Sequence, residues 1–190
     1  TDEQRTIALY WADNAGETGT PSGHWLLIAS QMISEQHINA RDAMRIVLAT
    51  AVAQADAFIA AWGYKFRYVT IRPRTYIRRL MDPKWEPLIP TPPFPEHPAG
   101  HSTQSAAAAT VLTTFMGTVP FTDSTSISIG HAVRHFDSFT AASVEAGMSR
   151  IYGGIHFPHG NDGGRALGTC VGMAVVKAFD AHPVTAAAPK

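Results

Sequence analysis

Seven prolines, at positions 83, 87, 90, 92, 93, 95 and 98, crowd the segment 82–98 and constrain the fold more than any other feature of the chain. Proline fixes the backbone angle φ and has no amide hydrogen to donate, so this segment cannot be the interior of a helix. We expect an extended and largely stiff loop. It is longer than an ordinary connection, and long ordered loops commonly carry function.

Helical periodicity dominates the chain on both sides of this loop. Before it, apolar spacing predicts helices over 25–36 and 40–62, the second capped by Asn39, with Gly63 as an interruption before a helical stretch over 64–71. After it we expect helices over 102–116, 138–152 and 165–181, separated by loops over 117–136 and 153–164. With at least five helices and no alternating strand pattern, the sequence predicts an all-α fold: one helical domain over 1–181 and a flexible tail over 182–190.

Composition narrows the classes of function. Lys plus Arg and Asp plus Glu each number 15, so the chain lacks the net charge of a general nucleic-acid or anionic-membrane surface, although a local basic pocket remains possible. The single cysteine, Cys170, excludes an intramolecular disulfide. We expect no membrane span, because no apolar run is long enough. The chain begins at Thr1 and carries no signal peptide, which fits a piece of a longer or processed protein.

Two cations and a helix start form the first part of a candidate site. Lys65 and Arg72 are seven residues apart, about two helical turns, so they would project from nearly the same face. Like charges stacked in this way are unfavourable unless an anion lies between them. Further on, Gly100 precedes His101 at a helix N-terminus, where backbone N–H groups attract anions.

The second part of the candidate site is the stretch 149–156. Arg150 offers a planar guanidinium suited to oxyanions, and the paired glycines after it allow His156 to face the same cavity. Taken alone, each of these cations and histidines has an ordinary reading as a surface cation, a capping-region histidine or a core histidine. Together they are explained most simply by a pocket for a tetrahedral oxyanion, in which one histidine attacks or coordinates the central atom and the other moves protons.

The ordered motifs Lys-x6-Arg-Pro, Pro-x-Gly-His and Ser-Arg-x5-His resemble the signature shared by vanadium-dependent haloperoxidases and type 2 phosphatidic-acid phosphatases. The amino-acid sequences of segments 89–96 and 152–157 also resemble those of bacterial haloperoxidases. The resemblance implies a helical bundle of the haloperoxidase/acid phosphatase type and a periplasmic or secreted bacterial location. It further implies that an N-terminal helical half, or a second subunit, supplies one wall of the access channel.

The resemblance also implies a role for each site residue. Vanadate, or phosphate in the same site, would be held by the side chains and backbone groups of Lys65, Arg72, Ala99, Gly100 and Arg150. His156 would be the axial ligand to vanadium and His101 the acid–base partner. The implied reaction is oxidation of a halide, bromide or iodide rather than chloride, by hydrogen peroxide, followed by transfer to a small organic acceptor.

Two rival functions remain open. One is a phosphomonoesterase that acts on a phosphate ester through a phospho-His156 intermediate; the other is a non-catalytic phosphate-binding module. Replacing His156 would abolish turnover in either enzyme and change nothing in a scaffold.

Two positions depart from the pattern. Ala99 stands where the family usually has serine, so a hydroxyl contact worth about 0.5–1.5 kcal/mol is missing, unless Ser102 or Thr103 supplies one. Many phosphatases place an aspartate four residues after the histidine, where this chain has Gly160. Asp162 is the candidate that would orient the His156 ring, with a backbone carbonyl as the alternative.

Three other groups of histidines lie outside the motifs of the candidate oxyanion site or suggest a different kind of site. The stretch 21–24 spells Pro-Ser-Gly-His but precedes Lys65, so we expect it to lie outside the site. A zinc site built from His156, His159 and Asp162 is disfavoured, because Pro158 would break the helix that puts them on one face. His97, beside the second motif, is expected to line the cavity mouth.

Overall fold

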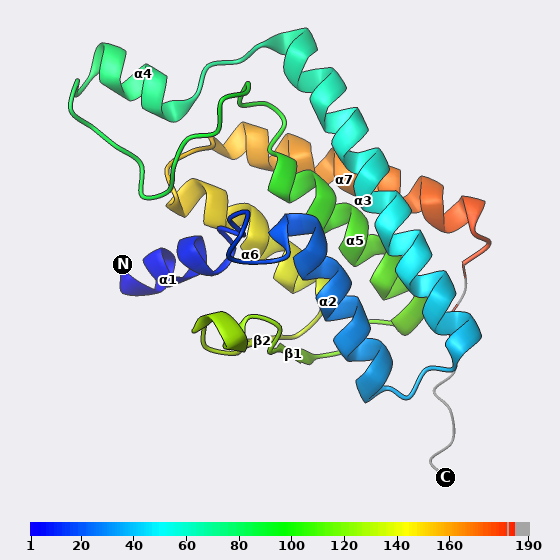
Figure 1. Cartoon of the computed structure of the whole chain (residues 1–190). Helices are drawn as coiled ribbons and strands as arrows, with labels where there is room; N and C mark the ends of the chain where they lie inside the picture. The colour runs from blue at the N-terminus through cyan, green and yellow to red at the C-terminus, as the bar shows by residue number, and fades with distance from the viewer. Residues whose placement is uncertain (182, 185–190) are drawn as a thin grey trace.

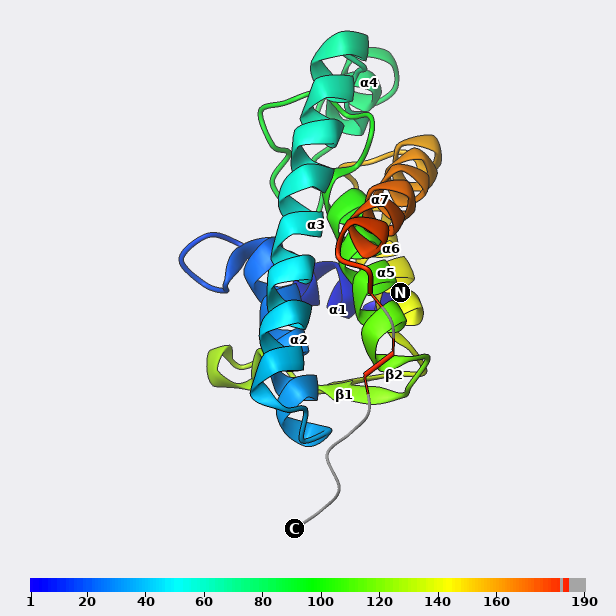
Figure 2. The ribbon, with the colours of Figure 1, turned by 90° about the vertical axis from the view of Figure 1, so that its right-hand side faces the viewer.

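Helix α5 (Gly100–Met116) is the centre of the fold, because most of its side chains are small enough for other helices to pack closely around it. The computed structural model describes residues 1–181 and 183–184. Helices α3 (Ala40–Tyr68) and α7 (Pro158–Ala178) lie beside α5 in both ribbon views (Figures 1 and 2). Gly168 of α7 lies so close to α5 that a Cβ atom there would overlap the carbonyl of Thr103. Such close helix contacts bury the apolar core without large side chains.

Seven α-helices make up most of the described chain, with one 3-10 helix and one two-stranded antiparallel sheet. In chain order they are α1 (Asp2–Tyr10), α2 (Thr20–Glu35), α3 (Ala40–Tyr68), α4 (Pro73–Leu80), α5, β1 (Phe121–Asp123), η1 (Ile127–Ile129), β2 (Arg134–Phe136), α6 (Phe139–Tyr152) and α7 (Pro158–Ala178). In the sheet, Phe121 pairs with Phe136 and Asp123 pairs with Arg134. The prediction of an all-α helical bundle is confirmed, apart from this small hairpin.

Gly63 does not interrupt its helix, contrary to the sequence-based expectation. Helix α3 continues through it to Tyr68 and begins, as expected, at the Asn39 cap. Gly63 is exposed, and a Cβ atom there would touch nothing within 4 Å. A helix-interior glycine costs only about 1 kcal/mol, so burial of Ala57, Ala61 and Lys65 on the opposite face is enough to keep the helix intact.

Other boundaries differ from the prediction, and helix α2 begins at Thr20 rather than at 25. Helix α7 begins at Pro158, not at 165, because a proline in the first turn of a helix gives up no hydrogen bond. Helix α4 was not predicted; it begins at Pro73 for the same reason. Of the predicted flexible tail over 182–190, position 182 and positions 185–190 lie outside the described residues. The Val184 N–H donates to the Phe115 carbonyl.

The proline-rich segment is extended and carries no helix, as predicted. It is tied to the bundle by backbone hydrogen bonds: Ile89 donates to Gly153, Glu96 donates to Thr70, and Ala99 donates to Gly160. The segment therefore leads directly into the N-terminus of α5, and it brings the side chains just before that helix to fixed positions.

The most apolar stretch of the described chain lies within Ala40–Leu80, which is mainly α3. By length and composition alone this stretch could cross a membrane. The finding is weak evidence, because core helices of soluble proteins pass the same test.

Candidate active site

Five side chains predicted to form the site come from five separate places in the fold and meet beside the N-terminus of α5. Lys65 lies in the last turn of α3, Arg72 caps α4, His101 is in the first turn of α5, Arg150 is in the last turn of α6, and His156 lies just before α7. Lys65 is fully buried, and Arg72, Arg150 and His156 are at most 6% exposed. The chain thus buries three cationic side chains next to two histidines.

Lys65 is held by the end of the proline-rich loop. Its Nζ donates to the carbonyls of Pro95 at 2.9 Å and Glu96 at 3.0 Å, which leaves one N–H of the ammonium group for a ligand. Burial, and secondarily the charge of Arg72, lowers the pKa of Lys65 to about 7, while Glu96 acts in the opposite direction. The ring of Phe94 lies 5.1 Å from both Lys65 Nζ and the Arg72 guanidinium, and its π face offsets part of their repulsion.

Arg72 and Arg150 each anchor part of the guanidinium and leave another part without a partner. Arg72 donates through Nε to the Phe94 carbonyl and through Nη1 to the Ile155 carbonyl, whereas Arg150 donates through Nη1 to the Trp11 carbonyl. Burial lowers the pKa of each guanidinium to about 10, so both remain charged at neutral pH.

Three nitrogen atoms of the site residues have no hydrogen-bond partner in the described part of the chain. Within the described residues, Arg72 Nη2, Arg150 Nε and His101 Nε2 are buried and have no hydrogen-bond partner. A buried unsatisfied polar group costs about 1–3 kcal/mol, and more when it is charged. A bound oxyanion such as vanadate or phosphate would accept hydrogen bonds from the two guanidinium nitrogens, so the residues present fit such a group.

Glu96 orients His156, and the sequence prediction of Asp162 for this role is wrong. His156 Nδ1 lies 2.8 Å from Glu96 Oε1, and the Phe157 N–H donates to the same oxygen. Asp162 is exposed, and its recorded partner is Arg165 at 3.5 Å. Gly160, at the position where many phosphatases carry aspartate, is required here, because a Cβ atom would overlap the Glu96 carboxylate.

The Glu96 contact determines which nitrogen of His156 is available. Since Nδ1–H donates to the carboxylate, the lone pair resides on Nε2, which lies 3.0 Å from Arg72 Nη1. Burial, reinforced by the charges of Arg72, Lys65 and Arg150, holds the pKa of His156 well below its usual range. Burial likewise lowers the pKa of His101 well below its usual range. Both imidazoles are therefore neutral, and the Nε2 lone pair of His156 accepts a hydrogen bond from Arg72 Nη1 that a ligand on Nε2 would have to displace.

Glu96 is the functional residue that the sequence reasoning missed. It is fully buried and occupies the end of the proline-rich loop, four positions before the α5 N-terminus. The available signal was an acidic residue two positions before the second motif. No spacing rule connects that position to His156, because the two are 60 residues apart in the sequence.

Ala99 is the N-cap of α5 and provides no side-chain hydrogen bond. Neither predicted substitute for a serine hydroxyl is free: Ser102 donates to Asn161 Oδ1, and Thr103 donates to the Ala99 carbonyl. The suggestion that these hydroxyls donate to the oxyanion is therefore wrong, and the backbone of Ala99 and Gly100 is what α5 offers at this end.

The second copy of the Pro-Ser-Gly-His motif lies in the first turns of α2 and serves a different purpose. His24 is buried between Asp13 and Asp123, with Nδ1 at 3.0 Å from Asp13 Oδ1 and Nε2 at 2.8 Å from Asp123 Oδ2. Burial opposes protonation, but the hydrogen bonds to the two carboxylates outweigh it and raise the pKa of His24 to about 9. Both ring nitrogens are occupied, so His24 has none for a ligand.

Comparisons with known proteins identify the family of this chain. Residues 45–183 match the family model described as the VCPO second helical-bundle domain. The vanadium chloroperoxidase of Curvularia inaequalis is 25% identical over 216 residues, an alignment that covers 81% of this chain and 36% of that protein.

Solved structures show the same likeness. A bacterial vanadium-dependent iodoperoxidase superposes with a TM-score of 0.87 at 37% identity, covering 92% of this chain and 43% of that one. A holo-type bacterial vanadium-dependent chloroperoxidase has a TM-score of 0.74 at 20% identity, covering 95% and 44%, and this second likeness concerns the fold alone. This chain spans less than half the length of these relatives, and by the family match it belongs to the VCPO second helical-bundle domain family.

Proposed function

We propose that this chain holds the vanadate-binding site of a haloperoxidase that oxidises bromide or iodide with hydrogen peroxide. The observation that carries the proposal is the pair of buried, unpartnered guanidinium nitrogens of Arg72 and Arg150, with the unpartnered Nε2 of His101, beside a neutral His156. Bound vanadate would supply a Lewis-acidic centre that activates hydrogen peroxide for two-electron oxidation of the halide.

The protein's own residues supply binding, orientation and proton control. Lys65, Arg72 and Arg150 would bind the oxygens of the oxyanion, together with backbone N–H groups at the start of α5. His156 would coordinate through Nε2, because Glu96 holds the ring proton on Nδ1; the Arg72 N–H that Nε2 now accepts would turn to the oxyanion instead. His101 Nε2, which has no other partner, would accept and return a proton at the oxyanion.

Of the named relatives, the iodoperoxidase supports a preference for iodide over chloride, whereas the other two are chloroperoxidases. The bacterial iodoperoxidase is the more similar of the two solved relatives in both sequence and backbone. The small organic acceptor would react with the hypohalous product rather than bind at the oxyanion pocket.

A phosphatase activity is the alternative supported by a specific observation. A neutral histidine backed by a buried carboxylate is also a suitable nucleophile toward a phosphate ester, and the same three cations would bind its phosphoryl oxygens. Phosphate would compete with vanadate in the haloperoxidase and would be a product of the phosphatase.

Halide oxidation separates these functions. Bromide and iodide oxidation by hydrogen peroxide should appear after dialysis into orthovanadate without phosphate, and His156→Ala or Arg72→Ala should abolish it. Asp162→Asn is the matched control, because it changes an exposed carboxylate on the same segment that does not contact His156. Hydrolysis of a phosphate ester without halide oxidation would identify a phosphatase, and oxyanion binding with neither reaction would identify a binding module.

A further inference from the structure

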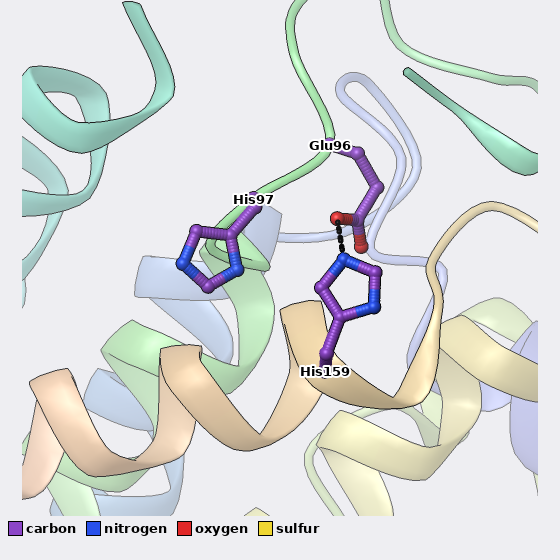
Figure 3. A group of neighbouring side chains, drawn as sticks. All are labelled: Glu96, His97 and His159. Atoms are coloured by element: carbon purple, nitrogen blue, oxygen red, sulfur yellow. Dashed lines mark ion pairs between the residues drawn. The ribbon is translucent and has the colours of Figure 1, made fainter. Parts of the chain in front are cut away.

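A second group of ligand-type side chains lies directly behind the oxyanion site. The group consists of Glu96, His97 and His159 (Figure 3). Each residue offers one potential metal-ligand atom, and these atoms lie within 4.8 Å of one another. Glu96 and His97 come from the end of the proline-rich loop, and His159 comes from the first turn of α7. Only His159 is shared with the zinc site that the sequence analysis considered and disfavoured.

The Glu96 carboxylate faces two ways. Its Oε1 accepts from His156 Nδ1 and from the Phe157 N–H, whereas Oε2 is buried and has no hydrogen-bond partner within the described residues. Oε2 lies 3.4 Å from His159 Nε2, a distance that is too long for a good hydrogen bond. A fully buried carboxylate oxygen is thus aimed into the space between the two histidines.

His97 is also incompletely satisfied. Its Nδ1 is buried without a partner, although the rings of His97 and His159 stack at 5.8 Å. The backbone on which both loop ligands sit is already fixed, because the Glu96 and His97 amides donate to the Thr70 carbonyl and hydroxyl. Room for the His97 ring exists only because residue 163 is glycine, where a Cβ atom would lie 2.6 Å from His97 Cε1.

We propose that Glu96 Oε2 and the imidazoles of His97 and His159 bind a divalent transition-metal ion of the zinc type, separate from the oxyanion site. Two imidazoles and one carboxylate are a common ligand set for Zn²⁺, which completes its coordination with water. Ligands of a tetrahedral ion with bonds of ~2.0–2.1 Å lie about 3.4 Å apart, so the donor atoms must draw together. His159 can make this movement by side-chain rotation, because its side chain is 63% exposed.

Metal binding itself tests the proposal, with no vanadate, peroxide or halide present. Untagged, chelator-stripped protein carrying Cys170→Ser, which removes an exposed thiol, would be titrated with Zn²⁺ against a chromophoric chelator. One ion should bind per chain. His159→Ala and His97→Phe should each weaken the affinity by at least about tenfold, since even second-shell losses cost that much. His135→Ala, which removes an exposed histidine on β2, is the matched control and should leave the affinity unchanged.

A variant that loses Zn²⁺ affinity because it has unfolded would be recognised by two measurements. Circular dichroism and the thermal midpoint of each metal-free variant would be compared with the parent, and His97→Phe keeps an aromatic ring against Tyr68 and His159. Co²⁺ in place of Zn²⁺ should give the visible absorption of a four- or five-coordinate site, lost in His159→Ala. Equal Zn²⁺ affinity in the parent and both site variants, or no stoichiometric binding, would overturn the proposal. Either result is independent of whether the chain oxidises halides.

Discussion

Oxyanion affinity should fall steeply as the pH rises through the titration range of Lys65. In the anion-free protein its pKa is about 7, chiefly because of burial and then because of Arg72. A bound anion would stabilise the ammonium form and return the pKa toward its ordinary value of 10.5, so binding above neutrality must be accompanied by proton uptake. The affinity is therefore highest below pH 7.

The size of this effect follows from the two pKa values. If Lys65 moves from about 7 to about 10.5 on binding, the dissociation constant rises about 90-fold between about pH 6 and about pH 9. That factor corresponds to ~2.7 kcal/mol at 1.36 kcal/mol per pKa unit. Neither histidine of the site contributes in this range, because the pKa values of His101 and His156 lie well below 6.5.

Sulfate is the appropriate probe, because it is tetrahedral and its own charge is constant over this range. Calorimetric titration in an anion-poor buffer would give its dissociation constant at each pH. Lys65→Met, which keeps the apolar stem, should bind sulfate weakly and with little pH dependence. Lys84→Met changes an exposed lysine on the proline-rich loop and should retain the full dependence. A sulfate affinity constant within twofold across the range, or a dependence that survives Lys65→Met, would refute the reasoning.

Three further perturbations have defined outcomes. Gly63→Ala should raise the free energy of unfolding by about 0.5–1 kcal/mol in urea titrations, since the site is helical, exposed and open; an unchanged midpoint would contradict this. Ala99→Ser should tighten sulfate binding about tenfold, from the ~1.5 kcal/mol of a hydrogen bond to a charged group, and calorimetry would show no change if the hydroxyl points elsewhere. His24, whose pKa is raised to about 9, should contribute stability that is complete below pH 6.5 and is lost as the pH rises through 9. Urea denaturation would give the free energy of unfolding of wild type and of His24→Gln at each pH. A difference between the two that stays constant across this range would show that the imidazolium is not the stabilising form.

Local patterns predicted the parts of the fold that depend on nearby residues. Asn39 as a helix cap and the proline-rich loop both follow from the chemistry of a few consecutive residues, and both were found as predicted. The prediction at Gly63 failed, because the packing of the opposite face of α3 outweighs a local preference. The hairpin of β1 and β2 was missed, because three-residue strands are too short to show alternation.

In the site, too, some residues could be predicted from local sequence and others could not. The positions of Lys65, Arg72, Arg150 and His156 follow from motif order, and the structure gathers them as the pattern suggested. The partner of His156 does not follow, because Glu96 reaches it from a distant loop through a contact that only the folded chain creates. Sequence spacing favoured a neighbour in the chain, whereas the structure uses a neighbour in space.

The hydrogen bond from Arg150 to the Trp11 carbonyl also makes the pocket depend on a distant part of the chain. It joins residues 139 positions apart, and Trp11 is further tied to the same helix by its indole N–H, which donates to Glu145. Contacts of such large sequence separation form late, because a long loop must close before they are made. We therefore expect the pocket to acquire its final arrangement of positive charge only when the segment after α1 docks on α6.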